Sequence, residues 1–517
     1  MGWPELFASS RVTAPLVGAT AGEDDDEDEP MPSFDVDELF AEALAKEDDG
    51  SEPAGEPPLP APELPGLVQL RHEQPTGADI TTPGRAGELA QLRRLGRDCL
   101  DEIGIMGNLR RLEGDEPWVD AIEGYERRLL CALDALMAYG ESVAGAEARL
   151  DVAELALDHA DQATVDDPFR CFARTLVLGS LTGEDKVRAA VMGVRQSDPR
   201  THRAQQDALI LAPSPHVDGA MRRLCRDLGG DPLLVRLALR VLHGRRVEGL
   251  PEAVALLEHP DHEVRAWAAR CLAVAEPALA DAWLGELASS DAEDDEVVVA
   301  ALEAQLWSDR SSALIALRGR LEEELAEPGV LSSSARRELV RLLAMGGEAR
   351  DTELLSSAVG RHPAELDALG WHGDGQHCMT LLTALERPGQ APRAAAAALH
   401  RITGARFGEE GATPYQPTRD VDRWRQWWAA EGERFEAGQR YRLGEPYTLE
   451  ASRDELATPG VPIRIREGLA YELAVALGEL GVNVHGWVAV QHNELRALVI
   501  PKDRCAAGGW PRLSRPS

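Results

Sequence analysis

A short pattern recurs along this chain at an interval that few folds can accommodate. The segment that begins at Asp261 reads D-x-x-V-R-x-x-A-A-x-x-L, and a copy begins at Asp231, 30 residues earlier. A degenerate copy follows at Asp295, and weaker ones lie at Asp185 and Ala335. Self-similarity at intervals of 30–45 residues is typical of stacked helical pairs that share one continuous core. The pattern therefore predicts an all-α fold, an α-solenoid of helical-hairpin repeats.

Each residue type in the pattern has a physical role. Asp231 and Asp261 are expected to accept hydrogen bonds from the unpaired N–H groups at a helix start. Val264 fills the core between helices, and the pair of Ala residues lets the next helix approach closely. Arg236 and Arg265 can reach the acid of their own repeat or the matching acid of the next one. We therefore interpret these five residues as structural.

Glycine-containing turns punctuate the same region. Turns around Gly346 and Gly370 are expected to join the two helices of one repeat. A glycine would end the first helix in the left-handed conformation, and Asp374 would cap the second. Gly370 and Asp374 are therefore also interpreted as repeat-structural residues.

The N-terminal part has a different composition. Residues 21–65 hold 17 acidic side chains and one Lys, so residues 1–85 are expected to form a disordered arm that cannot bury enough apolar surface to fold. One apolar island, at 34–46, is either a transient helix without a role or a helix that folds on a partner's groove. Its candidate interaction residues are Phe34, Leu39 and Phe40.

From residue 86 the spacing of apolar residues is helical. Residues 86–160 are expected to form an N-terminal helical pair or cap, and residues 161–437 the repeats. Residues 438–517 would form a C-terminal helical cap with a small irregular tail. A short β-hairpin is expected around 482–500.

The order of several motifs resembles a known class. Besides the repeats, these are Asp166-Asp-Pro-Phe169, Trp427-Trp428 and Arg466-Glu-Gly-Leu-Ala470. Over roughly residues 86–495 the chain is similar to HEAT-repeat proteins, and in particular to an uncharacterised proteobacterial HEAT-repeat family. The resemblance implies an α-solenoid and a location of the gene near type VI secretion clusters, but no established activity. The acidic arm departs from the family pattern, so the resemblance implies no role for it.

One cluster has the residue types of a metal site. His372, Asp374, His377 and Cys378 lie close together in sequence, and Asp and His at a helix start could share an ion. The same residues also fit a glycine turn in which Asp374 caps backbone N–H groups, and we favour that interpretation. His259 and His262, which flank Asp261, are interpreted in the same way, so no metal or cofactor is expected.

Aromatic and basic residues supply the other candidates. Trp424, with Trp427 and Trp428, is interpreted as a buried cap of the array. The alternative is a protein-binding hot spot. Arg240 and Arg270 are expected on a solvent-facing side, where they could contact a partner. Dense arginines between 222 and 246 leave open a basic stripe for nucleic acid.

Charge and cysteine usage restrict the environment. The net charge of −35 disfavours nucleic acid and anionic membranes and favours partners with basic surfaces. Seven Cys are scattered singly without a CxxC motif, as in a reducing compartment. No secretory signal or membrane-spanning segment is apparent. A cytoplasmic location is expected.

No catalytic motif is found, and no catalytic residue is assigned. We therefore expect a non-enzymatic protein-binding scaffold or adaptor, which could be accessory to a secretion system. The alternative is an enzyme or small-ligand binder built on HEAT repeats, which would need perturbed polar residues clustered in one pocket. A nucleic-acid-binding protein is the least favoured class.

Overall fold

A computed structural model describes residues 85–510 of the chain. Ten gaps interrupt this range, at 113, 121–123, 142–149, 164, 228, 276, 361, 408–414, 479–480 and 502–507. The acidic arm, the expected helix at 34–46 and the candidates Phe34, Leu39 and Phe40 lie outside the described residues.

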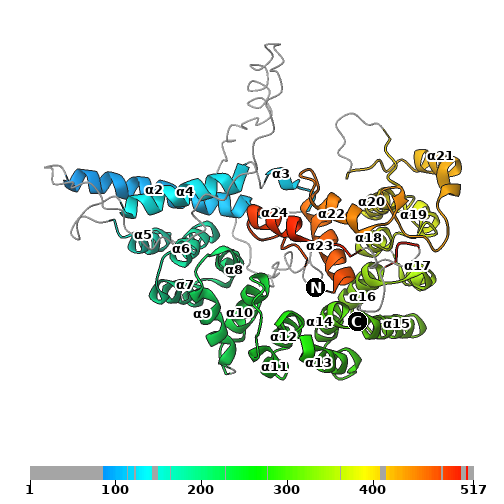
Figure 1. The fold of residues 1–517 in the computed structure, drawn as a ribbon, viewed down its shortest axis with the longest axis horizontal. Coiled ribbons are helices and arrows are strands. Elements are labelled where there is room, and N and C mark those ends of the chain that lie inside the picture. The colour runs from blue at the N-terminus through cyan, green and yellow to red at the C-terminus, as the bar shows by residue number, and fades with distance from the viewer. Residues whose placement is uncertain are drawn as a thin grey trace, which may run out of the picture. The chain divides into compact units, whose positions relative to one another are not determined.

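The described residues form an all-α solenoid, which confirms the predicted fold class (Figure 1). It begins with α2 (Arg85–Leu109), α3 (Trp118–Asp120), α4 (Glu126–Glu141), α5 (Val152–Asp161) and α6 (Pro168–Ser180). Two rows of helices follow, with the 3-10 turns η3 (Pro199–Thr201) and η4 (Ala349–Asp351) between them.

The odd row and the even row are named after the labels of their helices. The odd row consists of α7 (Glu184–Gln196), α9 (His216–Arg226), α11 (Glu252–Leu256), α13 (Pro277–Ser289), α15 (Arg310–Ala326), α17 (Thr352–Ala358) and α19 (His377–Ala384). The even row consists of α8 (His202–Leu211), α10 (Pro232–Gly244), α12 (His262–Ala275), α14 (Asp295–Ser308), α16 (Ser333–Gly346), α18 (Pro363–His372) and α20 (Ala391–Thr403). Each even helix packs on the next even helix, so the even row is a continuous layer.

The strong repeats start successive helices of the even row. Asp231 accepts a hydrogen bond from Leu233 N at 3.0 Å, and Asp261 accepts one from Val264 N at 2.9 Å. These bonds satisfy N–H groups that a helix start leaves unpaired. The weak copy at Asp185 differs, because it lies in α7 of the odd row.

The repeat arginines link each repeat to the next. Arg236 forms an ion pair with Glu263, and Arg265 pairs with Glu293 at 2.9 Å. Each acid belongs to the repeat that follows the arginine. Val264 is fully buried, in keeping with a core position.

The chain after the rows is partly helical. It contains α21 (Val421–Glu431), η5 (Gly432–Arg434), a two-stranded hairpin of β1 (Tyr441–Arg442) and β2 (Glu445–Pro446), α22 (Leu449–Leu456), α23 (Ile463–Leu477) and α24 (Val488–Ala497). The prediction of a β-hairpin at 482–500 is wrong, because α24 occupies most of this segment. Trp487 precedes α24 and donates its indole N–H to Leu211 O at 3.0 Å, so tertiary packing decides the local structure.

The C-terminal helices cover part of the even row. α23 contacts α14 and α16 (Figure 1). Between α23 and α24, Asn483 donates to Gly244 O at the end of α10, at 2.8 Å. Val488 N donates to Glu126 of α4 at 2.7 Å. This face of the even row is therefore occupied by the chain's own C-terminal segment.

Candidate functional site

The turn after α18 is tightly built. Gly373 ends the helix with φ +83°, in the left-handed region that favours glycine. Gly370 lies inside the helix, where a Cβ would come within 2.7 Å of Ala398 Cα in α20. Gly370 therefore permits close packing of α18 on α20. At the expected turn around Gly346, α16 ends at Gly346 and the next residue, Gly347, has φ −73°. The prediction of a left-handed glycine is therefore wrong at this turn.

Asp374 is a buried link between three segments. Its carboxylate accepts hydrogen bonds from Gln376 N and Thr352 Oγ1, both at 2.9 Å, and from Gly438 N at 3.2 Å. Asp374 thereby ties α17 and the start of α19 to the loop before β1.

The candidate metal cluster is satisfied by the protein's own groups. His372 and His377 share a hydrogen bond of 2.8 Å between ring nitrogens. The other ring nitrogens contact Glu348 O and Ser356 Oγ, each at 3.1 Å. Burial lowers the pKa of His377 to about 4 and that of His372 well below its usual value, so both rings are neutral at pH 7.

Metal-ligating side chains do not gather elsewhere in the described residues. No three His, Cys, Asp or Glu among them lie close enough together to hold an ion. His259 Nδ1 accepts a hydrogen bond from Asp261 N at 3.1 Å, and His262 lies 3.5 Å from Glu296. Burial raises the pKa of the Cys378 thiol, which disfavours a thiolate ligand.

Trp424 is part of a buried aromatic cap. It is 1% exposed, and its indole N–H donates to Thr418 O at 2.8 Å. Its ring lies 4.7 Å from Phe407 and 6.3 Å from Trp427. The alternative prediction that Trp424 contacts a partner is therefore wrong, because no partner can reach this side chain in this conformation.

Arg240 and Arg270 do not lie on an open face. Arg270 is 4% exposed and donates from Nε to Glu303 at 2.8 Å. Arg240 is half-buried, with its guanidinium 5.1 Å from the Trp267 ring centroid. The prediction of a solvent-facing Arg270 is wrong, because its counter-ion lies 33 residues further along, in the next even helix.

The dense arginines between 222 and 246 are engaged within the protein. Arg226 pairs with Glu252, Arg245 with Asp218 and Arg246 with Glu494. Arg222 donates to the carbonyls of Glu248 and Gly249. These arginines are paired within the protein, whereas a nucleic-acid-binding surface needs arginines that are free to contact phosphates.

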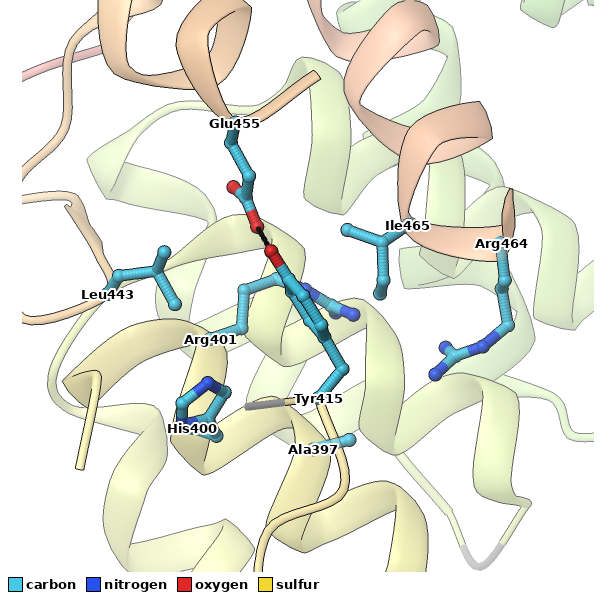
Figure 2. A pocket seen from close by; sticks show the side chains of 8 residues that line it. All are labelled: Ala397, His400, Arg401, Tyr415, Leu443, Glu455, Arg464 and Ile465. Atoms are coloured by element: carbon cyan, nitrogen blue, oxygen red, sulfur yellow. Dashed lines mark hydrogen bonds between the residues drawn. The ribbon is translucent and has the colours of Figure 1, made fainter. Parts of the chain in front are cut away.

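A small pocket lies between α20, α22 and α23. Figure 2 shows the Tyr415 hydroxyl directed at Glu455, at 3.4 Å. Burial raises the pKa of Glu455 despite the nearby Arg442 and Arg401. The pocket is narrow and has room for about one water molecule. The lining residues are Ala397, His400, Arg401, Tyr415, Leu443, Glu455, Arg464 and Ile465. The pocket is therefore too small for a substrate in this conformation.

Exposed apolar side chains favour the odd row. Met192 of α7, Ile315 of α15 and Met379 of α19 are 42%, 66% and 59% exposed. Among the described residues of α8 through α20 in the even row, no large hydrophobic side chain is exposed to this degree. Surface that is free for a partner is therefore more apolar on the odd row.

The outer face of α15 has an unusual composition. Ser311, Ile315, Gly319, Glu322 and Ala326 follow one another at intervals of three or four residues, and all are exposed. This spacing puts them on one side of a helix. A Cβ at Gly319 would meet nothing within 4 Å, so intramolecular packing does not require the glycine. We call these five residues the α15 strip.

The sequence did not point to the α15 strip. Its small and apolar residues have the 3.6-residue period of any helix, and periodicity alone does not tell a buried face from an exposed one. Which face of α15 is exposed follows only from its position in the odd row.

The fold defines an all-α helical-repeat protein whose C-terminal helices cover part of its even row. No protein-family model matches the chain, and no curated protein matches its sequence. Within the described residues, no helix has the length and apolar character needed to cross a membrane.

Proposed function

We propose that the chain is a non-enzymatic protein-binding scaffold or adaptor, and that the α15 strip is a contact surface for its partner. The observation that carries the proposal is Ile315, which is 66% exposed between small residues in the middle of a long helix. Because α23 covers the even row at α14 and α16, a partner is more readily received on the odd row.

The composition of the α15 strip supports a close helix contact. Gly inside a helix costs about 1 kcal/mol relative to Ala, and nothing in the described residues packs on Gly319. Small side chains let a second helix approach closely. Glu322, Glu323 and Glu327 are exposed toward the C-terminal end of α15, so the complementary partner is an amphipathic helix with a basic flank.

The proposed setting is the cytoplasm. Cys171, Cys225, Cys271 and Cys378 are buried free thiols, which is typical of proteins in a reducing compartment. The resemblance to HEAT-repeat proteins is compatible with an adaptor accessory to a secretion system, and the proposed partner would then belong to that system.

The proposal can be tested by site-specific photocrosslinking in cells of the source organism. A photoreactive amino acid at position 311 should give one defined adduct with a second protein. Ile315→Arg should abolish that adduct and leave the melting temperature within about 2 °C, because surface substitutions change stability little. The matched control places the photoreactive group at position 192 of α7, outside the α15 strip, and should give no such adduct.

The result can also refute the proposal. An adduct that persists in Ile315→Arg, or that forms equally from position 192, would show that the α15 strip is not the contact surface. The absence of any adduct from position 311 would overturn the scaffold function at this surface. An adduct of twice the chain's mass would identify self-association instead of a partner.

A further inference from the structure

One repeat position forms a column along the even row. The ninth residue after the capping residues Asp231, Asp261, Asp294 and Ser332 is, in turn, Arg240, Arg270, Glu303 and Arg341. Because α10, α12, α14 and α16 pack in order, these four positions lie side by side. Glu303 accepts hydrogen bonds from Arg270 at 2.8 Å and from Arg341 at 3.4 Å.

Aromatic side chains close the column into a ring. Trp267 lies 5.1 Å from the guanidinium of Arg240 and 4.9 Å from that of Arg270. The His243 ring lies 5.8 Å from Trp267 and 6.3 Å from Trp307.

Tyr471 of the C-terminal helix α23 completes this ring. Its ring centroid lies 5.9 Å from that of Trp307 and 5.1 Å from the guanidinium of Arg341. The donor ring is therefore built by four even helices and α23. Its members are Arg240, His243, Trp267, Arg270, Glu303, Trp307, Arg341 and Tyr471.

Hydrogen-bond donors in the donor ring lack acceptors. Within the part of the chain that the structure describes, no partner is found for six buried donor atoms: Trp267 Nε1, Trp307 Nε1, Arg270 Nη1 and Nη2, Arg240 Nε and the Tyr471 hydroxyl. Arg270 and Tyr471 are each 4% exposed. Native proteins rarely bury several unpaired donors together, so a missing acceptor is the simplest explanation.

The charges of the donor ring favour an anion. Arg270 and Arg341 donate to Glu303, and Arg341 also donates to Glu338 at 2.8 Å. The acids near Arg240 are Glu263 and Glu296. Burial works against ionisation of Glu303, but Arg270 and Arg341 hold its pKa below the ordinary value. Burial lowers the pKa of His243 to about 4, with Arg270 adding to the effect. The donor ring itself therefore holds three guanidinium groups, one carboxylate and a histidine that is neutral at pH 7.

We propose that the donor ring binds a small oxyanion, a phosphate, sulfate or carboxylate group, through Arg270, Arg240 and the N–H and O–H groups of its aromatic side chains. Arginine suits such ligands, because its N–H groups match two oxygens at once. The ligand must be small, since Trp267 and Arg270 are buried and only Arg240, His243, Trp307 and Arg341 are partly exposed. This site is separate from the α15 strip and does not depend on it.

The proposal can be tested by calorimetric titration of the full chain, with the melting temperature and tryptophan fluorescence as further readouts. Inorganic phosphate, sulfate and acetate are titrated separately, each at an ionic strength held constant with NaCl. Tyr471→Phe removes an unpaired hydroxyl without removing the ring, so it should keep the fold and weaken binding about tenfold. Arg240→Gln should weaken binding at least as much.

Tyr447→Phe is the matched control, because Tyr447 is a buried tyrosine under Arg440 outside the donor ring. It should leave binding unchanged. Binding of phosphate and sulfate would identify a tetrahedral oxyanion, and binding of acetate alone a carboxylate; either supports the proposal. No heat and no thermal shift beyond those of NaCl would show that water fills the site and would overturn it. Equal weakening by Tyr447→Phe would also overturn it.

Discussion

Two buried glutamates illustrate two ways of holding charge inside this protein. Glu303 lies between Arg270 and Arg341, which the repeat places in neighbouring helices. Glu472 of α23 accepts from Arg442 at 2.7 Å and also binds Arg440. Arg440 and Arg442 come from the non-repeated hairpin region, where residues two apart lie on the same side.

The two networks differ in how deeply their arginines are buried. Glu472 also accepts from Ser452 at 3.1 Å, and Arg440 donates to Trp371 O at 2.9 Å. Glu472 and both of its arginines are at most 4% exposed. Both networks keep buried donors without a hydrogen-bond partner among the described residues, such as Arg270 Nη1 in one and Arg442 Nη1 in the other. The Glu303 network differs in that it reaches the partly exposed Arg341. The comparison indicates that the Glu472 network anchors the C-terminal hairpin in the interior, whereas the Glu303 network extends toward the protein surface.

The largest expected effect is that of Glu472→Gln. It leaves Arg440 and Arg442 buried without their shared counter-charge, so the free energy of unfolding should fall by about 3–5 kcal/mol. Urea denaturation followed by circular dichroism measures this change. Glu450→Gln, at an exposed site of α22, is the control and should change it by less than about 0.5 kcal/mol. A loss below about 1 kcal/mol for Glu472→Gln would contradict the anchoring role.

Glu303→Gln should cost less. Arg341 keeps its pair with Glu338 at 2.8 Å, whereas Arg270 loses its carboxylate. We expect a loss of about 2 kcal/mol, below the range for breaking a fully buried pair, in the same urea experiment. Losses of equal size for Glu303→Gln and Glu472→Gln would erase the distinction between the two networks.

Acid should weaken the protein through its neutral histidines. Burial lowers the pKa of His243, beside Glu303, and of His377 to about 4, against about 6.5 in the unfolded chain. The unfolded state therefore binds more protons below pH 6.5. Each histidine should remove roughly 2 kcal/mol of stability between pH 7 and pH 5, and more toward pH 4.

Histidine variants show which residues cause this loss of stability in acid. His377→Gln should flatten the plot of unfolding free energy against pH between 7 and 5, and His243→Gln should do the same on the Glu303 side. Glu303 adds a loss only at lower pH, because its lowered pKa makes its contribution disappear as pH falls below about 4.5. An unchanged slope in both variants would show that other groups set the pH dependence.

The parts that could be predicted from the sequence rest on local signals. The caps Asp231 and Asp261 depend on N–H groups two or three residues away, and the repeat spacing follows from the alternation of one even and one odd helix. The same repeat could have revealed Arg240, Arg270 and Glu303 as equivalent positions, had the copies been aligned through the ninth residue after each cap.

The parts that were missed depend on distant residues. Tyr471 joins the donor ring only because the chain returns to the even row after the repeats. Arg270 was expected at the surface because arginines usually are, and its burial depends on Glu303. The segment before α24 contains Val482 and Val484, whose alternation suits a strand, but Trp487 and Val488 dock on α8 and α4 instead.

The smallest expected effect distinguishes Tyr471 of the donor ring from Tyr447, which lies beside Arg440. The Tyr471 hydroxyl lies among unpaired donors, so in buffer without oxyanions Tyr471→Phe should change the free energy of unfolding by less than about 0.5 kcal/mol, or raise it, because deleting an unsatisfied buried group removes a penalty. With phosphate at saturation the same variant should become less stable than the wild type, since it binds the anion less tightly. Tyr447→Phe should show no such dependence on phosphate. Urea denaturation of both variants, with and without phosphate, measures the difference. If Tyr471→Phe destabilises the protein by more than 1 kcal/mol without phosphate, the hydroxyl already has a partner and is not a free donor for an anion.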